Sequence, residues 1–253
     1  MLKQVKAHRF SAFIIGVLLI ISACSGERFS ELMKASRDGN LEAVQRALDN
    51  GAEVDFQNKK GKTALMLAAS NGHTATVKLL IDHGADINLQ DYFGTTAIIV
   101  AATAGHTETA QFLAQKGADP TYKDSSGGSA LSNAVFFGHD ETIKALLGFS
   151  KNLAKADAEE IMLVACGLGH IDTVKQLLEF GVSADARGLK QRTALMAAAA
   201  FNKIEVAKTL LDHEANPALK DSDGVNAFDV ANDKGNEEMI KLLSENYGKQ
   251  KPK

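Results

Sequence analysis

The sequence predicts an all-α protein, a solenoid of about seven stacked helix-turn-helix repeats whose connecting loops form β-hairpin-like fingers. Three observations support this. Similar segments begin near residues 30, 63, 96, 129, 160, 193 and 226, at steps of 33, 33, 33, 31, 33 and 33 residues. Each segment holds two amphipathic helical patterns and then a polar stretch that usually ends in Gly. One such repeat cannot bury its own apolar face, so neighbouring repeats are expected to stack.

The first helix of each repeat is predicted from its cap and its apolar face. In the second repeat, Thr63 precedes the segment "ALMLAAS" and is suited to accept the unpaired N–H groups of a helix start. Leu65, Ala68 and Ala69 then fall on one face. The two small alanines on that face allow a neighbouring helix to approach closely.

The second helix is predicted from the segment "TATVKLLIDH", which places Val77, Leu80 and Ile81 on its inner face. Gly84 follows, at the position where a positive φ commonly ends a helix. The polar segment "ADINLQDYFG" then predicts a finger loop that returns the chain to the next repeat.

The fourth repeat departs from this pattern. Residues 150–160, "SKNLAKADAEE", replace its finger and are two residues shorter. Their Ala, Lys and Glu content favours a helix or a tight link. Two interpretations remain open: neutral variation of a loop, or a kink that widens the groove between the two halves of the stack.

Both ends of the stack carry polar residues at positions that are apolar or small in interior repeats. Near the start these are Lys34, Ser36, Arg37 and Asp38, and the last repeat is similarly polar. Polar outer faces on terminal repeats prevent end-to-end association. The predicted repeat domain therefore spans residues 30–245, and a basic tail follows over residues 246–253.

The repeated pattern T-A-L-M-x-A-A-x-x-G-H, followed by x-x-L-L-x-x-G-A-D, resembles the ankyrin repeat. The resemblance covers almost the whole predicted repeat domain, although Ala64 stands where the family usually has Pro, and Met66 where it usually has His. It implies protein partners that bind at the finger tips and at exposed positions just before the Gly-His turn. It implies no cofactor, no small-molecule substrate and no enzymatic activity.

The first residues predict an export signal. Residues 1–23 combine a basic head, an apolar run of about a dozen residues and a small-residue end, which is typical of a secretory signal peptide. Ile21-Ser22-Ala23-Cys24 resembles the lipobox of bacterial lipoproteins, which implies acylation of Cys24, with residues 24–29 as a short tether. Ser25 resembles the signal for the outer membrane, with the domain facing the periplasm. The alternative is an ordinary signal peptide or an uncleaved anchor.

Charge and composition exclude some partner classes. The net charge is −3, and removal of residues 1–23, which hold three basic residues and no acidic ones, leaves −6. Nucleic-acid binding needs a basic stripe, so we expect no nucleic-acid partner. The chain has two cysteines, which do not make a disulfide framework.

Unrepeated apolar residues mark a candidate docking face. At the two positions before the Gly slot of repeats four to six, the sequence places Phe136, Phe137, Leu168 and Phe201. These positions face solvent in related proteins, and aromatic clusters are typical of interaction sites. The alternative is that one Phe of each repeat turns inward beside small neighbours.

The finger tips give a second set of candidate partner-binding residues. These combine basic and aromatic side chains: Lys59, Lys60, Tyr92, Phe93, Arg187 and Lys190. Such tips favour a partner surface that is acidic and partly apolar. The alternative is a solvated edge without a binding role.

Histidine, cysteine and acidic residues give no convincing catalytic or metal site. The histidines of the Gly-His turns recur at the repeat spacing, so we interpret them as local hydrogen-bonding braces: His73, His106, His139 and His170. Cys166 takes the slot of Ala69 and Ala102 on the inner helix face and is expected to be buried. An enzyme site near the irregular fourth repeat would need four nearby acids, for which no pairing geometry follows from sequence: Asp140, Glu141, Asp157 and Glu159.

Together these features predict a lipid-anchored periplasmic scaffold that binds a protein partner through its groove and fingers. Two alternatives concern the partner. The chain could be an immunity protein that blocks a toxic effector enzyme, or an accessory factor for a periplasmic stress-defence enzyme such as catalase.

Overall fold

The computed structural model describes residues 30–150 and 153–246. The predicted signal peptide, Cys24 with its tether, and the tail beyond residue 246 lie outside the described residues. The described chain forms two compact units. Unit 1 holds the residues up to Ala118 together with Asp124–Ser126, and unit 2 holds Asp119–Lys123 and the residues from Gly127 onward.

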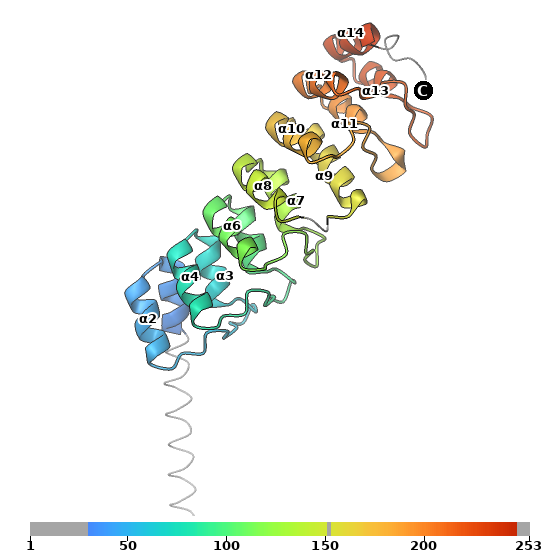
Figure 1. Cartoon of the computed structure of the whole chain (residues 1–253). Coiled ribbons are helices and arrows are strands. Elements are labelled where there is room, and N and C mark those ends of the chain that lie inside the picture. The colour runs from blue at the N-terminus through green and yellow to red at the C-terminus, as the bar shows by residue number, and fades with distance from the viewer. Residues whose placement is uncertain (1–29, 151–152, 247–253) are drawn as a thin grey trace, which may run out of the picture. The chain divides into compact units, whose positions relative to one another are not determined.

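Unit 1 consists of paired helices in two rows (Figure 1). After a helix over residues 30–38, its helices are α2 (Leu41–Asp49), α3 (Ala64–Ser70), α4 (Thr74–Asp82), α5 (Ala97–Thr103) and α6 (Thr107–Gln115). The inner helices α3 and α5 pack side by side, and α4 packs between α2 and α6 in the outer row. Each inner helix also packs on the outer helix that follows it in sequence.

Unit 2 repeats the same arrangement. Its helices are α7 (Ala130–Phe137), α8 (Asp140–Leu147), α9 (Lys155–Leu168), α10 (Ile171–Glu179), α11 (Ala194–Ala200), α12 (Ile204–Asp212), α13 (Ala227–Asp233) and α14 (Glu237–Asn246). A short 3₁₀ turn, η1 (Leu189–Gln191), lies in a finger. The inner row runs α7, α9, α11, α13 and the outer row α8, α10, α12, α14 (Figure 1). The predicted solenoid of helix pairs is confirmed.

The fingers are tight turns rather than paired strands. Among the described residues, the only bridge recorded outside the helices joins Arg187 and Thr193. Backbone hydrogen bonds close the turn, as where the Asp91 N–H donates to the Thr95 carbonyl at 3.0 Å and the Gly94 N–H donates to the Asp91 carbonyl at 2.9 Å. The Asp91 carboxylate also accepts the N–H groups of Phe93 and Thr95, each at 2.9 Å. The finger shape is therefore fixed by the backbone and by one buried acid.

The first helices form largely as the sequence predicts. The Thr63 hydroxyl accepts the Met66 N–H at 3.2 Å, and Leu65 and its alanine neighbours on α3 are buried. The corresponding Thr96 is also buried, but its side chain makes no cap bond and its hydroxyl has no recorded partner. The same residue type thus caps α3 and only fills space at α5.

Burial on the second helix differs from the prediction at one position. Val77 and Leu80 are fully buried on α4, whereas Ile81 is only half-buried and Thr76 is buried in its place. The reason is that α4 packs against an outer helix on each side. The buried arc therefore extends to position 76 and leaves position 81 at its edge.

The fifth repeat begins earlier than predicted. Its first helix, α9, starts at Lys155 rather than near residue 160, and spans 14 residues where α11 spans seven. The extra turns occupy the sequence of the missing finger, so the helical interpretation of that segment is correct. A 2.6 Å hydrogen bond from the Lys123 Nζ to the Asp157 Oδ1 ties α9 to the preceding loop.

The polar end of the first repeat also needs a correction. Lys34, Arg37 and Asp38 are exposed, but Ser36 is fully buried and its hydroxyl has no recorded partner. Ser36 occupies the slot of the buried Ala69 and does not contribute to a polar outer face. No helix within residues 30–150 and 153–246 has the length and apolar character needed to cross a membrane.

Candidate protein-docking surfaces

Four apolar side chains lie exposed at the C-terminal ends of the inner helices of unit 2. We call Phe136, Phe137, Leu168 and Phe201 the aromatic face; they are 59%, 54%, 41% and 65% exposed, respectively. They come from α7, α9 and α11, of which α9 packs between the other two. The interpretation that one Phe of each pair turns inward is therefore wrong for Phe136 and Phe137.

Ring packing holds the α7 part of this face in place. Phe136 and Phe137 meet edge to face, with centroids 5.1 Å apart and an interplanar angle of 84°. The Phe137 ring also stacks beside His139, with centroids 6.2 Å apart. Such contacts reduce the side-chain freedom that a partner would otherwise have to restrict on binding.

Gly167 on α9 has no side chain and so leaves room for the Phe201 ring. The Phe201 ring carbons lie 3.4 and 3.5 Å from the position that a Cβ on Gly167 would take. Phe201 therefore rests against the α9 backbone while most of its surface stays exposed. The face is continuous from α9 to α11 because Gly167 replaces the larger residues found at this slot.

In unit 1 the candidate finger residues come together at two neighbouring tips. Lys59 and Lys60 are exposed, and so are Tyr92 and Phe93. The Tyr92 N–H donates to the Lys60 carbonyl at 3.4 Å, so the two tips are adjacent. The structure therefore brings these four basic and aromatic residues together, and their binding to an acidic, partly apolar surface stays a prediction.

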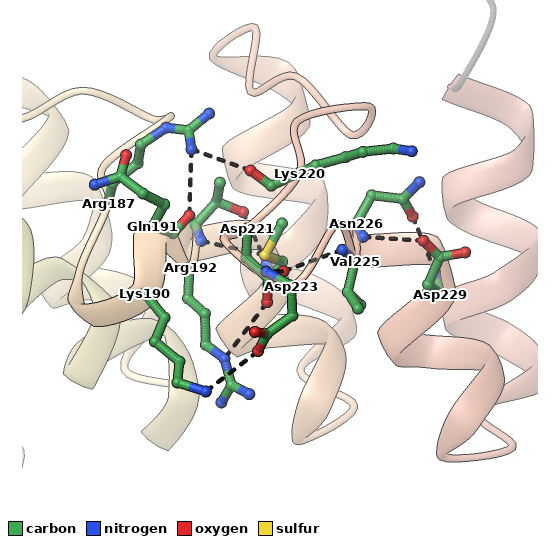
Figure 2. A network of polar contacts seen from close by, with 12 residues as sticks. Arg187, Lys190, Gln191, Arg192, Lys220, Asp221, Asp223, Val225, Asn226 and Asp229 are labelled. Atoms are coloured by element: carbon green, nitrogen blue, oxygen red, sulfur yellow. Dashed lines mark hydrogen bonds and ion pairs between the residues drawn. The ribbon is translucent and has the colours of Figure 1, made fainter.

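In unit 2 the candidate finger residues have structural partners (Figure 2). The Arg187 Nη1 donates to the Gln191 carbonyl at 3.3 Å and to the Lys220 carbonyl at 3.2 Å. The Lys190 Nζ pairs with the Asp223 carboxylate at 3.3 Å. These two side chains join consecutive fingers. That makes them weaker candidates for partner contacts than Lys59, Lys60 and Tyr92, whose side chains have no hydrogen bond or ion pair recorded in the described part of the chain.

Two of the four turn histidines, His73 and His106, bond to the preceding repeat, whereas the Nε2 atom of His170 is buried and has no recorded hydrogen-bond partner. The Nε2 atom of His73 lies 3.0 Å from the Arg37 carbonyl oxygen, and that of His106 lies 3.1 Å from the Ser70 carbonyl oxygen, in each case in the preceding repeat. The predicted hydrogen-bonding role is confirmed for His73 and His106, but the bond reaches the preceding repeat and is not local. Among the described residues no group of three or more potential ligands could hold a metal ion.

Cys166 and the acidic residues near the fourth repeat have structural roles. Cys166 is fully buried, and this burial raises the pKa of its thiol to about 12. Asp140 accepts the Thr173 hydroxyl at 2.6 Å, Asp157 is held by Lys123, and Glu159 lies 3.8 Å from Lys155. These acids are occupied in separate structural contacts and do not converge on one site.

Leu189 is an exposed apolar residue that was not among the predicted binding residues. Leu189, at the tip of the finger formed by residues 187–192, is 90% exposed. The sequence does mark this finger as different from the others. The other fingers have Asn or Asp five residues before the next helix cap and Gly two residues before it. This finger has Gly188 and Gln191 at those two positions.

The comparisons with known proteins identify the family. The family model for ankyrin repeats (three copies) matches residues 32–124, 131–221 and 161–253. The chain therefore belongs to the ankyrin repeat family.

Curated relatives share only part of their length with this chain. Ankyrin repeat and SOCS box protein 11 from Pongo abelii and from Homo sapiens are each 39% identical over 84 residues. That match covers 33% of this chain and 26% of each relative, so the chain spans about a quarter of the curated proteins.

Solved ankyrin domains match nearly the whole fold. The human ASB11 ankyrin repeat domain has a TM-score of 0.73 at 29% identity, covering 88% of this chain and 98% of that domain. The ankyrin repeat domain of Bcl-3, a member of the IkappaB protein family, has a TM-score of 0.73 at 25% identity, covering 85% and 97%. As an ankyrin repeat protein, the chain is a scaffold of the kind used for protein–protein interaction.

Proposed function

We propose that this chain is a lipid-anchored scaffold of the bacterial cell envelope, facing the periplasm, that binds a protein partner through the aromatic face. The observation that carries the proposal is the continuous exposure of Phe136, Phe137, Leu168 and Phe201 on three neighbouring inner helices. Single exposed apolar residues are common, but a contiguous group marks an interaction site. The basic and aromatic tips of unit 1 add a second contact region.

The exposed area supports a binding role of useful strength. A buried Phe side chain covers about 150–250 Å². The exposed fractions of Phe137 and Phe201 therefore leave about 100 Å² of each ring available to a partner. Covering that area contributes about 2 kcal/mol per ring, or roughly a thirtyfold change in affinity.

The anchor rests on the sequence around Cys24. A basic head, an apolar run and small residues directly before the cysteine are the features that support acylation. Several acyl chains hold a protein on a membrane far more firmly than one. Anchoring would confine the scaffold near the membrane and raise its effective concentration toward a partner there.

The anchor is tested by replacing Cys24 with Ala in bacteria fed a labelled fatty acid. We expect the parent protein to carry label and to sediment with membranes, and Cys24→Ala to lose both properties. Cys166→Ala is the matched control, since it removes the other cysteine and should keep both. Equal labelling of the parent and Cys24→Ala would refute the anchor and leave the scaffold.

The docking face is tested with Phe137→Ser and Phe201→Ser. We expect each substitution to weaken partner binding by roughly ten- to a hundredfold, because about 2 kcal/mol of apolar contact is lost. Phe180→Ser is the control: Phe180 ends the outer helix α10 and is similarly exposed, at 43%. Unchanged affinity in both face variants, or an equal loss in the control, would refute the assignment.

A further inference from the structure

The tips of two fingers in unit 1 form one exposed cluster. We call Lys59, Lys60, Tyr92 and Phe93 the tip cluster; all four are exposed, Tyr92 at 69% and Phe93 at 65%. The Tyr92 ring packs on the neighbouring tip, since a Cβ on Gly61 would lie 2.7 Å from its Cδ1 atom. The rings and the lysines are therefore held close together by the fold.

The tip cluster carries positive charge that no acid in the fold neutralises. Residues 56–62 hold three lysines and no acidic residue. Neither Lys59 nor Lys60 has a side-chain hydrogen bond or ion pair recorded in the described part of the chain. The acid of the second tip, Asp91, is buried and accepts the N–H groups of Phe93 and Thr95. Unpaired ammonium groups beside exposed rings fit a surface that has anionic groups above an apolar layer.

The chain enters unit 1 at the side where the fingers lie. The turn after α3 contacts the C-terminal end of the helix 30–38, where His73 lies 3.0 Å from the Arg37 carbonyl. The turn after α5 contacts the C-terminal end of α3 in the same way. The N-terminal end of the helix 30–38 therefore corresponds to the start of α3, whose cap Thr63 directly follows a finger.

The sequence limits the distance between this side of unit 1 and the proposed lipid anchor. Five residues, 25–29, separate Cys24 from the first helix and span at most about 18 Å. Lys60 precedes Thr63 by three residues, so its backbone lies within about 10 Å of a helix start. An acylated Cys24 would therefore hold the finger side of unit 1 near the lipid surface.

We propose that the tip cluster rests on an anionic lipid surface, with its lysines at the lipid phosphates and its two rings at the level of the headgroups. The inference rests on the proposed lipid anchor, and it assigns the second contact region of the proposed function to lipid. Aromatic rings favour the membrane interface, and lysines are attracted to anionic lipids. The place of the cluster beside the tether favours lipid over an acidic protein.

The anchor makes a weak lipid contact effective. A tethered chain holds the tip cluster at a high effective concentration toward the surface, so that a few charges and rings are enough to orient it. Each Lys near an anionic surface raises the ratio of docked to undocked chains roughly fivefold. Loss of two lysines should therefore lower this ratio roughly 25-fold. High salt should lower it as well, because the headgroup charges are screened.

The proposal is tested with the acylated chain, purified from bacterial membranes and reconstituted on lipid vesicles. A fluorescent thiol probe is attached at Ser125→Cys, an exposed position whose N–H donates to the Phe93 carbonyl at 2.9 Å. Cys166 is buried, so the added thiol is labelled selectively. Ala104→Cys, exposed at the opposite end of α5 from the fingers, is the control position. Lipids with a quencher on the headgroup report contact with the probe.

We expect quenching at position 125 and none at position 104 on vesicles of phosphatidylethanolamine and phosphatidylglycerol. Lys59→Gln combined with Lys60→Gln should lower the docked-to-undocked ratio roughly 25-fold. Vesicles of phosphatidylcholine alone should reduce quenching to a similar degree. Lys78→Gln combined with Lys116→Gln is the matched control, since it removes two charges from exposed positions of the outer row and should change nothing.

Four results would overturn the proposal. One is equal quenching at the two probe positions, and another is an equal effect of the two pairs of lysine substitutions. The third is an attached chain without quenching at position 125, which leaves the anchor intact; a parent chain that does not attach to vesicles at all refutes the anchor itself and this inference with it. The fourth is a photo-crosslinking amino acid at position 125 that captures a protein and no lipid in intact cells, since the occupant would then be a protein partner.

Discussion

The inter-helix turns should be sensitive to one added methyl group, and Gly72 shows why. It has a φ of 71°, and a Cβ placed on it would lie 2.6 Å from the Nδ1 atom of His106 in the next repeat. Gly84 provides a matched control, because it has a φ of 85° and no atom within 4 Å of an added Cβ. Comparing the two alanine variants separates backbone strain from the steric effect on the brace.

The magnitude follows from these two terms. An alanine forced into the left-handed region costs about 1–2 kcal/mol, which both variants share. Gly72→Ala must also displace the His106 ring from its 3.1 Å contact with the Ser70 carbonyl, and a lost hydrogen bond costs about 1 kcal/mol. We therefore expect Gly72→Ala to lower the free energy of unfolding by about 2–3 kcal/mol and Gly84→Ala by about 1–2 kcal/mol.

Urea unfolding followed by circular dichroism measures both variants, and a double-mutant cycle isolates the contact. In a His106→Ala background the obstructing ring is gone, so Gly72→Ala should then cost no more than Gly84→Ala. A coupling energy of about 1 kcal/mol or more supports the inter-repeat brace. Equal destabilisation by the two glycine substitutions, with no coupling to His106, would refute it.

Three further results are expected. Thr63→Ala should lower the free energy of unfolding by about 1 kcal/mol more than Thr96→Ala, because both are buried but only Thr63 caps its helix; urea unfolding that shows equal losses would contradict this. Cys166 should resist a thiol reagent at neutral pH in the folded chain and react after denaturation, because burial raises the pKa of its thiol to about 12; labelling before unfolding would count against its burial. The hydrogen bond to Asp157 raises the pKa of Lys123 in the folded chain. The contribution of this bond to folding stability is therefore complete below the pKa of an unfolded Lys, near 10.4, and is lost as pH rises through the pKa of Lys123 in the folded chain. Lys123→Met should therefore lower stability at neutral pH by less than about 1 kcal/mol, and the difference should close in alkaline solution; a gap that persists there would exclude the ion pair as its cause.

The architecture could be predicted because it depends on regular features of the sequence. A 33-residue period, a capping residue and one apolar face per helix are local signals, and stacking is the physical consequence. Cys166 is buried as predicted for the same reason, since its slot is small and apolar in every neighbouring repeat.

The contacts between repeats were harder to predict. Arg187 and Gln57 hold equivalent positions and make equivalent bonds, yet the two residues share only a donor group. His73 lies next to its own turn in sequence but reaches a carbonyl in the preceding repeat. Such pairs depend on which side chain can reach across a repeat boundary, and a single repeat read alone does not contain that information.

The sequence of the irregular fourth repeat predicts only part of its structure. The composition of residues 150–160 favours helix, but it does not indicate that the helix begins at Lys155 or that Asp157 in its first turn bonds to Lys123 in a different loop.

The central claim is that a repetitive framework carries its binding specificity on a few unrepeated exposed side chains. The most direct measurement places a photo-crosslinking amino acid at position 137 or 201, and at the exposed outer-row position 175 as a control, in intact cells. We expect positions 137 and 201 to crosslink one and the same protein, and position 175 to give no such product. Identical crosslinks at all three positions, or none at 137 and 201, would contradict the claim.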